Sequence, residues 1–197
     1  FSYCDSLISI NVSENNQKYM SDNGVLYTKD KTKLIKYPAG KKEEKYTISE
    51  DVSTIEENAF YECNSLKRII IPDSVTEIGK RNFYYCDSLT IYCTSASYAK
   101  EYAIEKNIEY IIDDQAPTIA SVTGNENWQK DKITLTIQAE DNQSGLAAEA
   151  YSFDNGQTWQ KGNTKTYTEN TNGIAIKVRD ALGNIATYET INIDKIF

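Results

Sequence analysis

One heptapeptide, Phe60-Tyr61-Glu62-Cys63-Asn64-Ser65-Leu66, returns further along the chain as Phe83-Tyr84-Tyr85-Cys86-Asp87-Ser88-Leu89. The chain also opens on a third version of it, FSYCDSL at residues 1–7. The offset from Phe60 to Phe83 defines one period, and a fixed period of this length is typical of a solenoid, in which each repeat forms one coil stacked on the next. Such an architecture presents surface, and its sequence period does not identify what contacts that surface.

Apolar residues recur inside each coil at positions that predict its shape. Leu66, Ile69 and Ile71 have the spacing of a short strand with alternate side chains pointing inward. A single coil has nothing to bury this apolar side against, so stability requires stacked neighbours. Equivalent side chains are then expected to form ladders along the stack, Phe on Phe and Cys on Cys.

The full pattern resembles a known repeat. Read from Phe60 to Gly79 it is Phe-x-x-Cys-x-Ser-Leu-x-x-Ile-x-Ile-Pro-x-Ser-Val-Thr-x-Ile-Gly, which is similar to the BspA-type leucine-rich repeat of bacterial surface and secreted proteins. The resemblance covers about residues 1–113. It implies a leucine-rich-repeat solenoid over that range.

The first repeat is separated from the second by an insertion at about residues 18–38. Phe1 and Phe60 lie much further apart than the single period that separates Phe60 from Phe83. Residues 24–28 and 33–37 flank the polar stretch 29–32, and this predicts a hairpin. We expect it to be a two-stranded excursion from the solenoid.

The last repeat is shortened by one residue and is followed by a predicted cap at about residues 94–112. Ala99, Tyr102, Ala103 and Lys106 share one face of a helix, and Asn107 suits a left-handed helix end. Residues 108–112 then predict a closing strand. A terminal unit that deviates in this way shields the last coil from water.

Composition changes at residues 113–117, a short polar link with one proline, and residues 116–197 read as a second domain. Strand-like segments are separated by turns rich in Gly, Asn and Asp, which predicts a small antiparallel β-sandwich. The predicted strands are 133–137, 150–153, 174–178 and 186–191, and the predicted turns are 144–145, 154–156, 171–173 and 182–184.

This second half resembles bacterial immunoglobulin-like modules of surface proteins. The motifs are Asp141-x-x-Ser144-Gly145-Leu146, Tyr151-Ser152-Phe153-Asp154-Asn155-Gly156-x-Thr158-Trp159 and Asp180-x-x-Gly183-Asn184. The resemblance implies a spacer or a binding unit, and it implies no antibody-type disulfide because this half has no cysteine. The predicted fold class is therefore mostly β: a leucine-rich-repeat solenoid with a short C-terminal capping helix, then an immunoglobulin-like β-sandwich.

Charge and hydropathy restrict the class of partner. The net charge is −8, and an acidic chain is a poor candidate for nucleic-acid binding, which needs clustered positive charge. No apolar run reaches the length that spans a membrane. We expect a piece of a longer exported protein, extracellular as a secreted or cell-surface protein, whose export signal and anchor lie elsewhere.

Cys4, Cys63 and Cys86 occupy the same repeat position and are expected to be small buried hydrophobes in a ladder. A disulfide between stacked cysteines is the alternative. The chain has no histidine and no Cys-x-x-Cys pair, so no metal site and no cofactor are predicted. The one candidate is calcium at Asp141, Asp154 and Asp180, for which turn chemistry is the preferred explanation.

The absence of histidine also excludes Ser-His and Cys-His nucleophilic sites. Carboxylates such as Glu56-Glu57 and Glu140-Asp141 have no spacing that singles out an acid and a base, and we read them as solvated surface. The chain is therefore predicted not to be an enzyme. Trp128 and Trp159 are expected to pack in the sandwich core, with carbohydrate stacking as the alternative.

These observations predict a non-enzymatic binding or adhesion module, with the solenoid sheet as its interaction face and a protein or glycan of a host or neighbouring cell surface as partner. An architectural spacer or accessory segment of a larger exoprotein is the alternative. Ile70 beside Tyr92 is the expected apolar anchor. The outward strand residues, in repeat order, are Ser9 and Asn11, Lys45 and Thr47, Arg68 and Ile70, and Thr90 and Tyr92.

The N-terminal end of the solenoid carries a separate expectation. Leu7, Ile10 and Val12 should line an uncovered edge, and apolar strand edges pair readily with another chain. The sequence therefore predicts self-association through residues 1–12. If the chain is instead a monomer, the hairpin at residues 24–37 would fold back as the missing cap.

Overall fold

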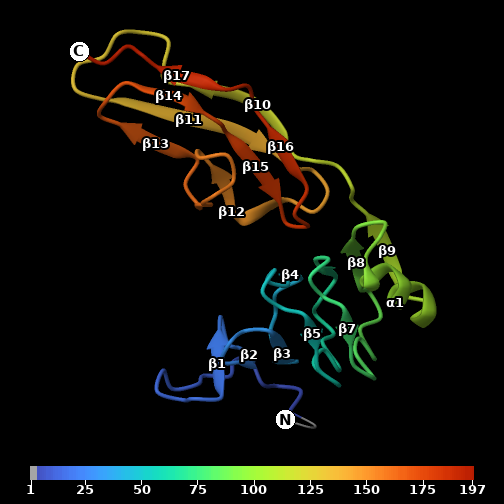
Figure 1. The fold of residues 1–197 in the computed structure, drawn as a ribbon. Coiled ribbons are helices and arrows are strands. Elements are labelled where there is room, and N and C mark those ends of the chain that lie inside the picture. Colours follow the sequence, from blue (N-terminus) through green and yellow to red (C-terminus); the bar gives the residue numbers. More distant parts are fainter. Residues whose placement is uncertain (1–3) are drawn as a thin grey trace. The chain divides into compact units, whose positions relative to one another are not determined.

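The structure, a computed structural model, describes residues 4–197 as mostly β with one α-helix in that range. It forms two compact units that divide between Asp113 and Asp114 (Figure 1). Each unit has its own apolar core. In residues 4–197 no helix is both long enough and apolar enough to cross a membrane.

The first unit is a solenoid built on two sheets of short strands. One sheet is parallel throughout, in the order β4-β6-β8-β9, and the other has the order β1-β2-β3-β5-β7. The strands of the first are β4 (Lys45–Thr47), β6 (Arg68–Ile70), β8 (Thr90–Cys93) and β9 (Glu109–Ile112). Those of the second are β1 (Tyr19–Asp22), β2 (Val25–Thr28), β3 (Lys33–Lys36), β5 (Thr54–Ile55) and β7 (Glu77–Ile78).

The strand register confirms the repeat read from the sequence. Lys45 pairs with Arg68, which comes one full period later in the chain, whereas Arg68 pairs with Thr90, which comes one position earlier than a full period. The missing position is the one by which the last copy is shortened. Ile69, Ile71 and Ile91 point into the core and are fully buried, as expected.

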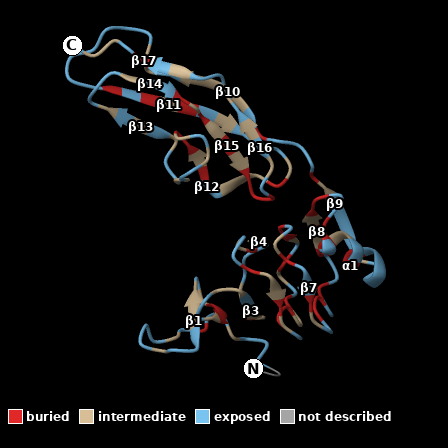
Figure 2. Ribbon diagram, viewed as in Figure 1, coloured by how far each residue is buried: buried red, intermediate tan, exposed pale blue. Residues whose placement is uncertain are grey.

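Buried residues line the coils of the solenoid (Figure 2), and a stack of aromatic rings runs through the core that they form. The ring of Phe60 lies 5.2 Å from that of Tyr37 and 5.3 Å from that of Phe83, stacked on both. Tyr102 meets Phe83 edge-on at 6.1 Å. Tyr37 stands one period before Phe60, so it occupies the Phe position of a further coil. This coil is hard to recognise in the sequence because it follows the insertion directly.

The hairpin predicted at residues 24–28 and 33–37 forms, because β2 pairs with β3, but the prediction that it is a two-stranded excursion from the solenoid was wrong. The insertion forms three antiparallel strands, and its last strand, β3, pairs in parallel with β5. Leu34 faces Ile55, which in turn faces Ile78, so the insertion continues the solenoid's own ladder. Apolar pairing along this ladder favours incorporation over an exposed hairpin, which has no core of its own.

The insertion also covers the N-terminal end of the core. Val25 and Tyr27 are buried, and the Tyr27 hydroxyl is hydrogen-bonded to that of Tyr46. Burial raises the pKa of Tyr27 to about 12, because the phenolate would be poorly solvated there. Tyr46 aligns with Ile69 and packs against the core.

The first segment of the chain lies against this insertion rather than forming an open edge. The Ile10 amide donates to the Gly24 carbonyl at 2.9 Å, and the Val12 amide donates to Ser21 Oγ at 3.0 Å. Ile10 is buried, so the expected exposure of this residue was wrong, and Leu7 and Val12 are half-buried.

These contacts support the alternative in which the insertion acts as the cap. Phe1 and the rest of residues 1–3 lie outside the described residues. Self-association through residues 1–12 stays a prediction, to be checked by light scattering over a wide concentration range. Because this edge is covered by the insertion, it exposes less apolar surface for self-association than the sequence indicated.

Of the three cysteines expected in one ladder, two are buried. Cys63 and Cys86 are free thiols, and Cys86 Sγ lies 3.3 Å from the Phe60 carbonyl oxygen, to which it donates. A hydrogen bond to Cys86 together with burial raises the pKa of Cys63. Cys4 is exposed, so the prediction was wrong for it.

The physical reason for the exposure of Cys4 is the Tyr37 coil, which stands between it and Cys63. That coil has Gly40 at the cysteine position, and the Gly40 amide donates to the Leu7 carbonyl at 2.8 Å. A Cβ on Gly40 would lie 2.6 Å from the backbone carbon of Ser6, so only glycine fits without a shift.

The C-terminal cap of the solenoid forms as predicted. Helix α1 (Tyr98–Lys106) begins after Ser97, whose side chain accepts from the Lys100 amide, and it ends at Asn107 in the left-handed conformation. Ala99, Tyr102 and Ala103 are buried. Lys106 was expected on the same face but is exposed, and its ammonium pairs with Glu105 at 2.7 Å.

The second unit is built from antiparallel strands in sheets β10-β11-β13, β12-β15-β16 and β14-β17. Its core takes side chains from both three-stranded sheets, among them Leu135 and Val178. The strands are β10 (Thr118–Thr123), β11 (Ile133–Glu140), β12 (Leu146–Ser152), β13 (Thr164–Tyr167), β14 (Thr171–Ile174), β15 (Lys177–Asp180), β16 (Ile185–Thr187) and β17 (Ile191–Ile193).

Two predicted strands of this unit are each divided in the structure. Residues 174–178 are split because β14 pairs with β17 while β15 pairs with β12 and β16. Residues 186–191 divide correspondingly into β16 and β17. Residues 171–173, expected as a turn, lie in β14. The immunoglobulin-like character of this unit stays a prediction.

Candidate binding surfaces

The outward side of the β4-β6-β8-β9 sheet carries two rows of side chains in register. Lys45, Arg68, Thr90 and Glu109 form one row, and Thr47, Ile70, Tyr92 and Ile111 form the other. Lys45, Thr47, Glu109 and Ile111 are exposed, and Arg68, Thr90 and Tyr92 are half-buried. We call these seven residues, without Ile70, the ladder face.

The exposure of Ile70 was predicted wrongly from the sequence. Ile70 was expected to be an exposed anchor beside Tyr92, but its side chain is fully buried. Thr47 and Tyr92 lie on either side of it in register, so its strand neighbours contribute to this burial. Strand alternation predicts which side of the sheet a residue faces, and it does not predict how closely its neighbours surround it.

Arg68 and Tyr92 form the most ordered contact of the ladder face. The guanidinium carbon of Arg68 lies 3.8 Å from the centre of the Tyr92 ring. A cation–π contact of this kind holds both side chains in place. Arg and Tyr are also the residue types that most often dominate binding energy at protein interfaces.

Ser9 and Asn11 do not extend the ladder face. Both are exposed, but the segment that contains them forms no strand of this sheet and bonds to the insertion instead. At the opposite end, β9 adds Glu109 and Ile111, which the sequence analysis did not include. The signal for them was the predicted closing strand at residues 108–112.

The two tryptophans lie outside the described core of the second unit, so the expected core packing was wrong for both. Trp128 is 63% exposed, and its ring lies 6.4 Å from that of Phe197. Trp159 is half-buried, with the Arg179 guanidinium 4.5 Å from its ring centre. Aliphatic side chains such as Leu135 and Ile176 fill the core instead.

The aspartates considered for calcium serve as turn acceptors, which was the preferred explanation. Asp154 accepts from the Thr158 amide and hydroxyl, and these bonds lower its pKa to about 2. Asp141 accepts from the Gly145 amide, and Asp180 accepts from the Leu182 and Asn184 amides. Carboxylate oxygens of Asp141 and Asp180 lie within 4.8 Å of each other, and Asp154 is not in that group.

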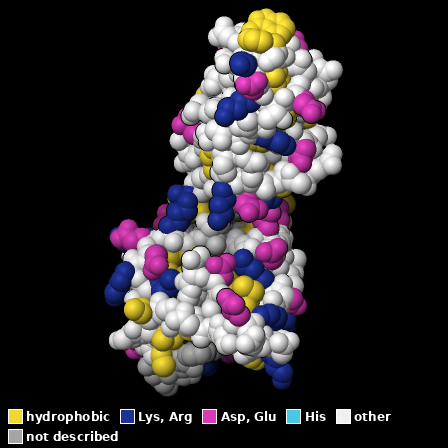
Figure 3. Space-filling model, turned by 90° about the vertical axis from the view of Figure 1, so that its left-hand side faces the viewer, with side chains coloured by type: hydrophobic (Ala, Val, Ile, Leu, Met, Phe, Trp, Pro, Cys, Tyr) yellow, Lys and Arg dark blue, Asp and Glu magenta, His cyan; other side chains and the backbone are white. Residues whose placement is uncertain are grey.

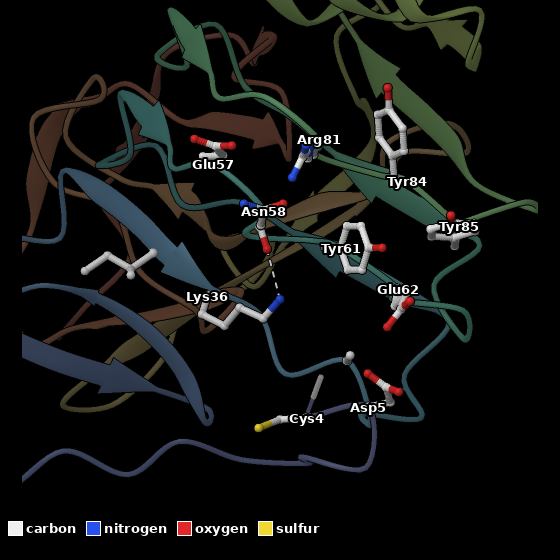
Figure 4. A pocket seen from close by; sticks show the side chains of 12 residues that line it. Cys4, Asp5, Lys36, Glu57, Asn58, Tyr61, Glu62, Arg81, Tyr84 and Tyr85 are labelled. Carbon is white, nitrogen blue, oxygen red and sulfur yellow. Dashed lines mark hydrogen bonds between the residues drawn. The ribbon is translucent and has the colours of Figure 1, made fainter. Parts of the chain in front are cut away.

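A cavity of about 540 Å³ opens between the end of β3 and the segments that connect the strands of the solenoid. We call it the tyrosine cavity, because Tyr61, Tyr84 and Tyr85 line it together with Asn58, Glu62 and Arg81 (Figure 4). Its volume is within the range of small-molecule sites. None of the ladder-face residues lines it.

Two carboxylates face each other at one side of the tyrosine cavity, those of Asp5 and Glu62 (Figure 4). The protonated Glu62 carboxyl donates a hydrogen bond to the Asp5 carboxylate, and this bond, with a smaller contribution from the negative charge of Asp5, raises the pKa of Glu62. Lys36 lies on the other side and donates to the Asn58 carbonyl at 2.9 Å. The cavity therefore contains charges of both signs.

The tyrosine cavity was not predicted from the sequence, although the repeat contained its signal. Tyr61 and Tyr84 are one period apart, as are Glu62 and Tyr85, so they fall on neighbouring coils at equivalent positions outside the strands. Aromatic residues at such positions have no core to fill.

Charged groups are mixed on the wider surface as well, where Figure 3 shows Lys and Arg side chains interspersed with Asp and Glu.

Comparisons with known proteins support the repeat assignment. Residues 36–115 match the BspA type leucine rich repeat region, in six copies. The resemblance noted in the sequence is thus confirmed over this range. The match begins at Lys36, so it includes the Tyr37 coil. The chain has no match among curated protein sequences.

Three solved structures are similar over part of the chain. The pneumococcal vaccine antigen PcpA is 29% identical over 43% of this chain, with a TM-score of 0.39. A leucine-rich repeat protein from Eubacterium ventriosum is 32% identical over 47%, with a TM-score of 0.39. A leucine rich cell surface protein from Faecalibacterium prausnitzii is 21% identical over 57%, with a TM-score of 0.40. The alignments cover 24%, 32% and 43% of those chains, which is less than half of each.

Proposed function

We propose that this chain is a non-enzymatic binding module of a bacterial cell-surface or secreted protein, and that the ladder face contacts a protein or glycan on a host or neighbouring cell. The observation that supports this most is the parallel register of β4, β6, β8 and β9, which sets seven accessible or half-accessible side chains in two straight rows. Solenoids use extended faces of this kind for their partners.

The composition of the ladder face fits a specific contact. Its centre is the Arg68–Tyr92 pair, which is already ordered and half-buried and so loses little side-chain freedom on binding. Its margins are polar or charged at Lys45, Thr47 and Glu109, and apolar at Ile111. A half-buried aromatic and arginine centre with a polar margin is the usual anatomy of a protein interface.

The test is a binding measurement with the whole chain immobilised. Collagen, fibronectin, laminin and a glycan array are the probes. We expect at least one to bind, and Tyr92→Ala and Lys45→Glu together to weaken that binding at least tenfold, about 1.4 kcal/mol. Thr187→Ala, an exposed change in the second unit, is the control and should leave binding unchanged.

A change of less than twofold in the double variant would remove the ladder face from consideration. Ile70→Asp is unsuitable for this purpose because a buried charge would perturb folding itself. Thermal unfolding of each variant separates loss of contact from loss of structure.

An architectural spacer or accessory segment of a larger exoprotein is the second candidate. The observation in its favour is that both ends of the solenoid core are covered, by Tyr27 of the insertion and by Tyr102 of α1, so these ends of the core are buried without a partner. Absence of binding to every probe would favour this function. The immunoglobulin-like reading of the second unit fits either role.

A further inference from the structure

The tyrosine cavity is a second candidate site, separate from the ladder face. We propose that it binds a neutral oligosaccharide, with the rings of Tyr84 and Tyr85 against the C–H faces of the sugar and with Arg81, Glu57 and Asn58 bonded to its hydroxyl groups. The inference concerns different residues from the proposed function and stands or falls independently of it.

The exposed tyrosine rings supply the apolar part of such a site. Tyr84 and Tyr85 are 54% and 58% exposed, and their ring centres are 6.5 Å apart. Tyr61 meets Tyr85 edge-on at 5.6 Å. Adjoining exposed aromatics of this size are unusual on a surface that binds nothing. A pyranose ring has a face of C–H groups that matches an aromatic face, while its hydroxyls extend sideways.

The polar groups of the cavity exclude a strongly charged ligand. Arg81 and Lys36 are cationic, whereas Asp5, Glu57 and Glu62 are carboxylates, and all five line the same space. An anion would meet the three carboxylates, and an amine would meet the two cations. A hydroxyl group both donates and accepts, so a sugar can use groups of either sign.

The walls of the cavity are held in place before any ligand arrives. The Asn58 amide donates to the Lys80 carbonyl at 3.1 Å, and the Glu62 amide donates to the Tyr84 carbonyl at 3.0 Å, which joins the two lining segments. Glu62, Arg81 and Tyr85 have positive φ values of 61°, 56° and 60°.

Left-handed backbone is uncommon for residues other than glycine and persists only where the surrounding structure imposes it. The lining side chains are therefore directed by fixed backbone. A preformed site of this kind reduces the entropy lost on binding.

The experiment titrates the whole chain with cellotetraose, maltotetraose, mannotetraose and the tetramer of N-acetylglucosamine, using calorimetry and ligand-observed NMR. We expect one or more of them to bind, and Tyr85→Ala and Arg81→Ala each to weaken that binding at least tenfold with unchanged thermal unfolding. Tyr110→Ala is the matched control, because Tyr110 is a partly exposed tyrosine that does not line the cavity. The affinity of the Tyr110→Ala variant for the sugar should stay within twofold of that of the unchanged chain.

Three outcomes would overturn the proposal. None of the four sugars binds, or binding survives both cavity variants, or a tetralysine peptide binds more tightly than any of the sugars. The ladder-face variant Tyr92→Ala should leave sugar binding unchanged. If no sugar binds in the cavity, the proposal for the cavity is wrong, and the proposed function of the ladder face is not affected.

Discussion

Replacing Phe60 with alanine should lower the free energy of unfolding of the first unit by about 3–5 kcal/mol. The Phe60 ring is fully buried and stacks on Tyr37 and Phe83 in the coils on either side. Its removal leaves a cavity that weakens two coil interfaces at once, and a solenoid is stabilised mainly by contacts between neighbouring coils.

The measurement is urea unfolding followed in the near-ultraviolet. Both tryptophans lie in the second unit, so tyrosine signals report mainly on the first. Tyr84→Ala is the control, since it also removes an aromatic ring, but one that is 54% exposed. Its effect should stay within about 0.5 kcal/mol. A loss below about 1 kcal/mol for Phe60→Ala would contradict the aromatic stack as a source of stability.

The second large effect is expected at Asn82, a polar side chain that is 2% exposed inside the solenoid. Its Nδ2 donates to the carbonyls of Glu56 and Gly79, both at 2.9 Å, and its Oδ1 accepts from the Phe60 amide at 3.1 Å. Asn82→Ala leaves all three backbone groups without this partner. Because each buried group left unpaired costs about 1–3 kcal/mol, we expect a loss of roughly 3 kcal/mol or more.

Urea unfolding also measures this change, with Asn64→Ala as the matched control at an exposed asparagine. Asn82→Asp adds a second reading, because it keeps an acceptor for the Phe60 amide but loses both donors and buries a charge. It should destabilise the unit at least as much as alanine. A stability within about 0.5 kcal/mol of the unchanged chain for Asn82→Ala would show that water replaces these bonds.

The sequence predicted the features that repeat, because a period is visible without any structure. The inward positions of Ile69 and Ile91, the capping helix and the shortened last coil all follow from aligning the copies. The buried hydrogen bonds of Asn82 could not be predicted in this way, because its equivalent in the preceding coil is Ala59. A network that occurs once leaves no repeat signal.

Features that depend on non-local pairing were the ones predicted wrongly. The insertion reads locally as a hairpin, and only the parallel pairing of β3 with β5 shows that it belongs to the solenoid. Tyr37 could have been recognised by its distance from Phe60, but Pro38-Ala39-Gly40, which follows it, does not match Tyr61-Glu62-Cys63 of the next coil. The exposure of Trp128 and the burial of Ile70 likewise depend on neighbours that spacing alone does not identify.

The central claim is that the insertion and the coils form one continuous solenoid, which holds the ladder face and the tyrosine cavity in place. Amide hydrogen exchange of the whole chain, read residue by residue by NMR, tests it most directly. The Glu56 amide donates to the Leu34 carbonyl at 2.9 Å, and the Gly79 amide, at the equivalent position of the next coil, donates to the Ile55 carbonyl at 2.7 Å. We predict that both amides exchange slowly and with protection of the same order, since local opening would have to separate packed coils. Rapid exchange of Glu56 beside a protected Gly79 would contradict the claim, because the insertion would then not be part of the solenoid.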